Sequence, residues 1–170
     1  MKKAVSLALV FLMVFSFGST AFAADAQYKL TRDFLTSIDG FDGLTWTVQD
    51  TVSDSTGNYE VVSFSYDGEY SEYVNNFVVL FAEDASEVQL YMYNLISFDK
   101  NRLPDVLSTV NDLNHRATGV KLFVDESDYS VTLEMYQLLP DTAPEELAAL
   151  AVGFFIGISD SIYEDLVNNI

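Results

Sequence analysis

The sequence contains few residues that could carry out catalysis. His115 is its only histidine, and its 170 residues include no cysteine. A lone histidine could serve as a general base or as one metal ligand, but zinc sites usually take three or four histidine or cysteine ligands. His115 directly follows a predicted helix, where a cation suits the negative end of the helix dipole. A structural role is therefore the simpler interpretation.

Motifs for nucleophilic, nucleotide-dependent and zinc catalysis are missing. The sequence has no G-x-S-x-G, G-x-x-x-x-G-K-[ST], G-x-G-x-x-G or H-E-x-x-H pattern. Glycosidases use a pair of carboxylates, and 26 acidic residues will form close pairs by chance. Nothing in the sequence singles out one pair, so we predict no catalytic residue and no cofactor.

Acidic turns could bind calcium weakly outside the cell. Three pairs of residues are candidates, and none has the spacing of an EF-hand loop. The pairs are Asp50 with Asp54, Asp67 with Glu69, and Asp125 with Asp128. The last pair is typical of a hairpin turn, and we predict no metal site.

Tyrosines are the most suggestive side chains. Tyr91 and Tyr93 alternate along a predicted strand and therefore share one face, while Tyr70 and Tyr73 follow Tyr66 around an acidic turn. Exposed tyrosines could bind a peptide or a sugar ring, but tyrosine also packs well in strands. We take Tyr70, Tyr73, Tyr91 and Tyr93 as candidate partner-binding residues, with core or edge packing as the alternative.

The charge balance restricts the class of partner. The chain carries 8 Lys and Arg against 26 Asp and Glu, a net charge of −18. An acidic surface repels phosphate, which argues against nucleic acid as a partner. The same charge favours solubility.

The first 23 residues have the pattern of a secretory signal peptide. Lys2 and Lys3 precede an apolar run over residues 4–17. The small residues Ala21 and Ala23 come just before the expected cleavage point, which lies between Ala23 and Ala24. The run is short for a membrane span, although a retained anchor is the alternative. We expect a secreted or periplasmic protein, and loss of the two lysines would change the net charge from −18 to −20.

The remaining residues, 24–170, are expected to form one α+β domain. Periodicity predicts helices over 28–38, 103–114 and from 143 onward. It predicts strands over 44–49, 59–66, 77–82, 88–98, 120–124 and 129–138. The order α-β-β-β-β-α-β-β-α, with short turns between consecutive strands, indicates an antiparallel sheet with helices packed on it.

The last helix has the clearest start signal. Thr142 and Glu145 fit a capping box, with Thr142 as the N-cap. The predicted apolar face comprises Leu147, Leu150, Ala151, Phe154, Ile158, Ile162 and Leu166, widened by Val152, Phe155 and Ile156. The continuous apolar stretch, 148–158, is too short to span a membrane. A core helix without membrane insertion is expected.

Three stretches of the sequence resemble the YbjN-type family, whose members are often labelled bacterial sensory-transduction regulators. They are NNFVVLFAEDASEVQLYMYNLISFDKNRLPDVLSTVNDLN, VKLFVDESDYSVTLEMYQL and TAPEELAAL. The resemblance implies a fold like the small chaperones of type III secretion, which are α+β dimers that hold client segments without chemistry. It brings no catalytic residue. Many members look cytoplasmic, whereas this chain begins with an export signal.

Two hypotheses follow. The first is an exported, non-enzymatic domain, chaperone-like or regulatory, that binds a protein or peptide partner and forms a homodimer. The alternative is a small extracellular carboxylate-based hydrolase or carbohydrate-binding protein. The hydrolase requires a deep pocket with two carboxylates, one of which has a perturbed pKa.

Overall fold

The computed structural model describes residues 25–39, 41, 43–66 and 76–170. Its order of helices and strands is the predicted one, which confirms the α+β class. The elements are α2 (Lys29–Ser37), β1 (Leu44–Ser53), β2 (Asn58–Tyr66), β3 (Asn76–Ala82), β4 (Glu87–Ser97), the short 3-10 helix η2 (Lys100–Arg102), α3 (Leu103–Arg116), β5 (Val120–Asp125), β6 (Ser130–Leu138) and α4 (Pro144–Asn169).

The six strands form one antiparallel sheet in the order β1-β2-β3-β4-β6-β5. The first four strands are neighbours in sequence and in space, as consecutive strands usually are. After β4 the chain passes through α3, and β5 then takes the edge of the sheet. β6 returns between β5 and β4, so it places its side chains beside those of β4.

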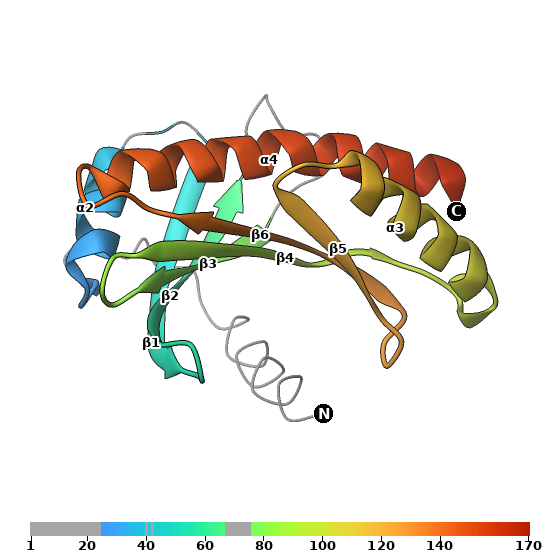
Figure 1. The fold of residues 1–170 in the computed structure, drawn as a ribbon, viewed down its shortest axis with the longest axis horizontal. Coiled ribbons are helices and arrows are strands. Elements are labelled where there is room, and N and C mark those ends of the chain that lie inside the picture. The colour runs from blue at the N-terminus through green and yellow to red at the C-terminus, as the bar shows by residue number, and fades with distance from the viewer. Residues whose placement is uncertain (1–24, 40, 42, 67–75) are drawn as a thin grey trace.

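The three helices lie on one face of the sheet, with α4 along its length and α2 and α3 towards opposite ends (Figure 1). Alternate strand residues point into the core that they form with the helices. Phe64 and Phe77 stack there with ring centroids 5.1 Å apart, and Phe34 of α2 lies 5.0 Å from Phe81. The spacing of Leu30, Phe34, Leu35 and Ile38 in the sequence predicts one apolar stripe, and all four residues are buried in this core.

The opposite face of the sheet is also apolar near its centre. Val61, Val78 and Leu80 project from β2 and β3 on this side, and no described helix lies on it (Figure 1). Val61 and Val78 are buried, and Leu80 is half-buried. Strands that are apolar on both faces are typical of sheets covered on both sides.

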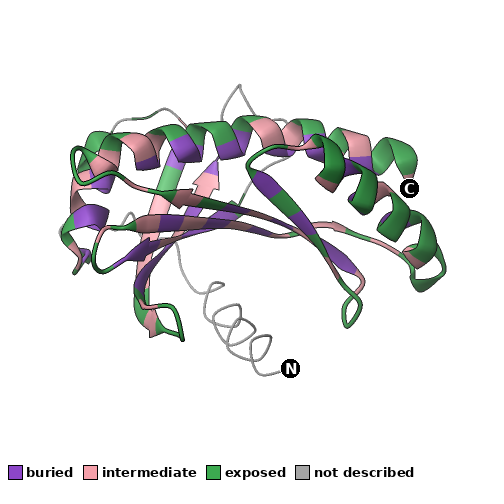
Figure 2. Ribbon diagram, viewed as in Figure 1, coloured by how far each residue is buried: buried purple, intermediate pink, exposed green. Residues whose placement is uncertain are grey.

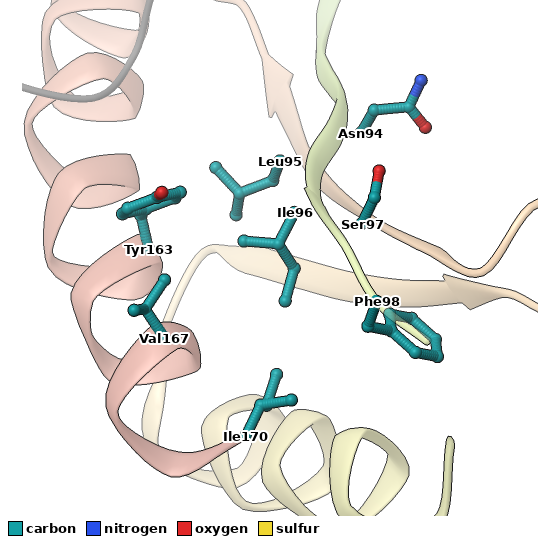
Figure 3. Close-up of a pocket in the computed structure, with 8 residues that line it drawn as sticks. All are labelled: Asn94, Leu95, Ile96, Ser97, Phe98, Tyr163, Val167 and Ile170. Atoms are coloured by element: carbon teal, nitrogen blue, oxygen red, sulfur yellow. The ribbon is translucent and has the colours of Figure 1, made fainter. Parts of the chain in front are cut away.

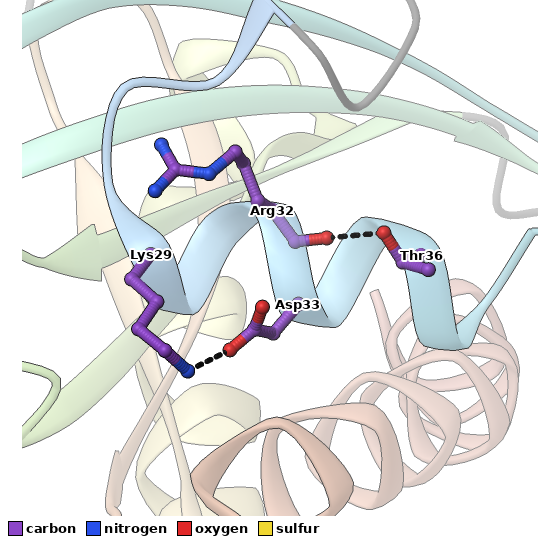
Figure 4. Close-up of polar contacts among 4 residues, drawn as sticks. All are labelled: Lys29, Arg32, Asp33 and Thr36. Carbon is purple, nitrogen blue, oxygen red and sulfur yellow. Dashed lines mark hydrogen bonds and ion pairs between the residues drawn. The ribbon is translucent and has the colours of Figure 1, made fainter.

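Local contacts support α2, a short helix near the start of the described chain (Figure 4). Lys29 forms an ion pair with Asp33 one turn later, and the Thr36 hydroxyl donates a 2.7 Å hydrogen bond to the Arg32 carbonyl. Arg32 Nη1 donates to the carbonyl oxygens of Ala26 and Gln27, at 3.0 and 2.5 Å. These bonds hold Ala26 and Gln27, which precede α2, against the helix.

A buried carboxylate from the sheet binds the backbone at the start of α2. Tyr28, the N-cap, makes no side-chain capping bond. Instead, the amides of Gln27 and Tyr28 donate to the two carboxylate oxygens of Glu60, at 2.6 and 3.0 Å. Glu60 is fully buried on β2, opposite the β1 bulge between Val48 and Thr51. Negative charge at a helix N-terminus is favourable. Glu60 therefore holds the start of α2 against the sheet.

The expected capping box of α4 is wrong. The N-cap is Ala143, in the left-handed conformation with a φ of 52°, and no side chain caps the helix. The capping box needs Ala143 as the first helical residue. A residue that precedes proline is disfavoured in the right-handed helical region, so α4 starts at Pro144 instead of continuing back to Thr142.

The predicted apolar face of α4 is wrong in part. Leu150 and Phe154 point to solvent, with 70% and 48% of their surface exposed, and Leu147 and Ile158 are only half-buried. The buried residues are Ala148, Ala151, Val152, Phe155, Ile156, Ser159, Ile162 and Leu166. Because apolar residues surround this part of the helix, their periodicity does not determine which side meets the sheet.

Among the described helices, α4 alone is long and apolar enough to cross a membrane by length and composition. The core helix of a globular protein passes the same test. The side of α4 that faces the sheet is buried (Figure 2). Crossing a bilayer would therefore detach it from the core, and the absence of membrane insertion stays a prediction.

Glu60→Ala should lower the free energy of unfolding by about 2–3 kcal/mol, because two partly buried amides lose a charged acceptor. Glu60→Gln, which keeps one acceptor oxygen, should lower it by about half as much. The measurement is urea unfolding followed by fluorescence of Trp46, the single tryptophan, which packs against the core. The control Glu126→Ala, in an exposed turn, should change stability by less than about 0.5 kcal/mol. Equal stability of Glu60→Ala and the wild type would contradict this role.

Candidate partner-binding surface

Tyr91 and Tyr93 share one face of β4, as predicted, and this face lies opposite the helices. Residues 88, 90 and 92 of the same strand belong to the core, so the odd-numbered residues point the other way. The two rings are stacked, with centroids 5.5 Å apart and an angle of 7° between their planes. Both side chains are half-buried. They form a flat aromatic platform on the sheet.

Strand pairing places further polar and aromatic residues around this platform. Glu134 of β6 lies directly opposite Tyr91, and Tyr136 lies opposite Gln89. We call the resulting surface the tyrosine face. It consists of Tyr59, Glu87, Gln89, Tyr91, Tyr93, Glu134 and Tyr136.

A network of hydrogen bonds orients the side chains of the tyrosine face. The hydroxyl groups of Tyr59 and Tyr136 each donate to the Glu87 carboxylate, the first at 2.7 Å. Gln89 Nε2 also donates to Glu87, at 2.8 Å, and its Oε1 accepts a 2.8 Å bond from the Tyr91 hydroxyl. Ordered side chains lose little entropy on binding, so this surface is pre-organised.

Burial controls the electrostatics of this surface. Desolvation raises the pKa of the Glu134 carboxyl. Lys121 of β5 lies directly opposite Glu134 in the strand pairing, but no described lysine or arginine forms an ion pair with this carboxylate. Desolvation also raises the pKa of Tyr91 and Tyr93, and the negative charge of Glu134 raises both further. The tyrosines therefore stay neutral, beside a carboxylate whose charge is poorly solvated.

The apolar part of the face continues to its edges. Phe123 of β5 and Leu138 of β6 lie on this side, with 51% and 63% of their surface exposed, and Tyr136 is 49% exposed. Nearer the centre, the Ser63 hydroxyl is shielded from solvent and has no hydrogen-bond partner within the described residues. The surface can thus offer aromatic, aliphatic, hydroxyl and carboxylate contacts together.

A separate pocket of about 390 Å³ lies where β4 bulges beside the end of α4. Asn94, at the bulge, has a φ of 52°. In Figure 3, Leu95 and Ile96 point towards Tyr163 and Val167 of α4. The lining contains no carboxylate, so this pocket does not supply the pair that the hydrolase alternative requires.

Several candidates lie outside the described residues. These are Tyr70, Tyr73, Asp67, Glu69 and the cleavage-site residues Ala21, Ala23 and Ala24. Tyr66, which was grouped with Tyr70 and Tyr73, is described and is buried in the core on the helix side. The binding role of Tyr91 and Tyr93 stays a prediction.

The other sequence candidates have local structural contacts. His115 lies in the last turn of α3, with Nδ1 2.7 Å from the Asn111 carbonyl oxygen. Asp125 accepts hydrogen bonds from the amide and hydroxyl of Ser127, which lower the pKa of its carboxyl. Asp128 accepts one from Ser130. In the described part of the chain, no group of three or more histidine, cysteine or acidic residues could hold a metal ion.

The sequence interpretation missed Tyr59, Glu87, Glu134 and Tyr136. Alternation along β4 and β6 could have placed each residue on a face. Their association needs the pairing of β4 with β6, two strands separated by α3 and β5. No local pattern specifies that pairing.

The fold and the surface define a small α+β protein with an aromatic face on its sheet. The chain belongs to the YbjN family, whose model matches residues 49–167 and is described as "Putative bacterial sensory transduction regulator". The match confirms the resemblance and indicates a regulatory class of protein. It runs from β1 into α4 and so includes all seven residues of the tyrosine face.

No match to the chain was found among curated proteins or among solved structures. The expected similarity to the type III secretion chaperones therefore stays a prediction.

Glu134→Gln should stabilise the protein at pH 7 and lose this advantage as the pH falls towards about 4. A carboxyl whose pKa is raised by folding contributes stability only at low pH, and loses it as the pH rises from the ordinary value of 4.5 through the raised pKa. Urea unfolding of both proteins across this pH range is the measurement.

Asp125→Asn is the matched control with the opposite sign. Because hydrogen bonds lower the Asp125 pKa, its carboxylate stabilises the protein above the ordinary value of 3.8 and loses this effect below it. The asparagine variant should therefore be less stable than the wild type at pH 7. A Glu134→Gln variant that is less stable than the wild type at pH 7 would show that the Glu134 charge is compensated in the folded protein.

Proposed function

We propose that the protein is an exported, non-enzymatic regulatory or chaperone-like domain that binds a protein or peptide partner through the tyrosine face. The observation that carries this proposal is the uncovered apolar side of the sheet. Phe123, Tyr136 and Leu138 have 51%, 49% and 63% of their surface exposed on this side, and the described helices all lie on the opposite side.

The chemistry of the face favours a partner segment with basic and apolar side chains. A lysine or arginine could pair with Glu134, whose charge is poorly solvated, and lie over the stacked rings of Tyr91 and Tyr93. Phe123 and Leu138 would contact apolar side chains of the same segment. The net charge of −18 would attract such a partner over a distance.

A regulatory role and a chaperone-like role require the same physical act here. In both, the protein covers an exposed segment of another chain without changing its covalent structure. The family description supports a regulator.

Binding can be tested by calorimetry with a short synthetic peptide in which lysine alternates with valine. We expect Phe123→Ala and Leu138→Ala each to weaken binding about fivefold to tenfold. The control Leu107→Ala removes an exposed leucine from α3, on the other side of the sheet, and should bind as the wild type. Glu134→Gln should weaken binding although it stabilises the free protein, and added salt should weaken it as well.

The control peptide has glutamate in place of each lysine and should not bind. Equal binding of the two peptides, or equal losses in Leu107→Ala and Leu138→Ala, would contradict the proposed surface. A neutral oligosaccharide tests the carbohydrate alternative. Saturable sugar binding that requires Tyr91 would favour it.

Export is part of the proposal, and the sequence of residues 1–24 supports it. Expression of the full chain in a bacterium should yield an extracytoplasmic protein whose intact mass corresponds to a start at Ala24. Ala23→Glu should block processing, because the cleavage site requires a small residue. Ala26→Gly, beyond the cleavage site, is the control and should be processed normally. An unprocessed cytoplasmic product from the wild-type chain would contradict export.

A further inference from the structure

The outer side of α4 is a second apolar surface, on the opposite side of the molecule from the tyrosine face. Leu150, Gly153, Phe154 and Gly157 fall at i, i+3, i+4 and i+7, and all four are exposed. Figure 2 shows the outer side of α4 exposed along much of its length. We call these four residues the outer stripe. A surface helix usually places charged and polar residues at such positions.

Neither the exposed apolar side chains nor the glycines of the outer stripe stabilise a single molecule. Leucine and phenylalanine are exposed there to water, and the two glycines are poor residues for a helix interior. A Cβ atom added at Gly153 or Gly157 would meet no atom within 4 Å. The fold would therefore accept alanine at both positions, so packing inside the molecule does not explain the glycines.

Charge indicates which partner fits this surface. Residues 147–159 carry no charge in a chain that has 26 acidic residues. Glu145 and Glu146 precede this stretch, and Asp160 and Glu164 follow it. An anionic membrane would be repelled by both ends and by the net charge of −18. A second copy can approach closely at the uncharged stretch, where like charges do not meet.

The outer stripe is complementary to itself. We propose that two copies of the chain associate by crossing their α4 helices at this stripe, around a two-fold axis. In an antiparallel crossing, the large Leu150 of each copy lies against the small Gly157 of the other, about 10 Å along the helix. Glycine at a crossing lets two backbones approach closely. The angle between the helices then separates their acidic ends.

This association is independent of the proposed binding at the tyrosine face, which lies on the other side of the sheet. It should also respond to salt in the opposite way. Salt screens repulsion between two acidic copies and so strengthens their association. It weakens the attraction of a basic peptide.

Sedimentation velocity of the exported protein over about 10–500 µM should show a weak dimer, because one helix crossing is a small interface. Gly157→Leu should weaken association about tenfold or more, since it fills the space that Leu150 of the other copy occupies. The control Asn168→Leu adds the same side chain about 16 Å further along α4 and should associate as the wild type.

Gly157→Ala separates folding from association. In dilute solution it should raise the melting temperature by about 2–4 °C, because alanine favours the helix, and at high concentration it should weaken the dimer. A wild type that stays monomeric, or a dimer unaffected by both Gly157 variants, overturns the proposal. Binding to phosphatidylglycerol vesicles that is lost in Gly157→Leu, without dimer formation, also overturns it.

Discussion

The structure depends on a sheet that is apolar on both faces and is covered by helices on one. Phe64, Phe77 and Phe81 pack against the helices on one side, and Phe123, Tyr136 and Leu138 stay exposed on the other. Burial of the first set builds the core. The second set stays exposed, so the same hydrophobic effect that stabilises the fold also favours a partner over this face in the proposed function.

Two carboxylates of the sheet illustrate how the surroundings of a buried charge decide its effect on stability. Glu60 is fully buried, but each of its oxygens accepts a hydrogen bond from the backbone before α2. Glu134 is half-buried and forms no ion pair with a described cation, although Lys121 lies opposite it on β5. A satisfied buried charge stabilises a fold, whereas an uncompensated one weakens it until a partner supplies the opposite charge.

The strongly acidic composition determines which kind of partner suits each exposed surface. It favours a basic partner for the tyrosine face, where Glu87 and Glu134 lie among aromatic rings. It also makes the uncharged stretch of α4 exceptional, because a second copy can approach there without meeting a carboxylate. The regulatory family to which the chain belongs is compatible with a protein that presents two binding surfaces on opposite sides of one sheet.

The sequence by itself determined the order of the elements, the stripe of α2 and the shared face of Tyr91 and Tyr93. These features follow from backbone periods of 3.6 and 2 residues, which act over a few neighbours. Only the tertiary structure decided that Glu134 lies opposite Tyr91 and that Leu150 faces solvent. Strand pairing across an intervening helix, and the orientation of a helix that is apolar all round, depend on long-range packing that no local pattern contains.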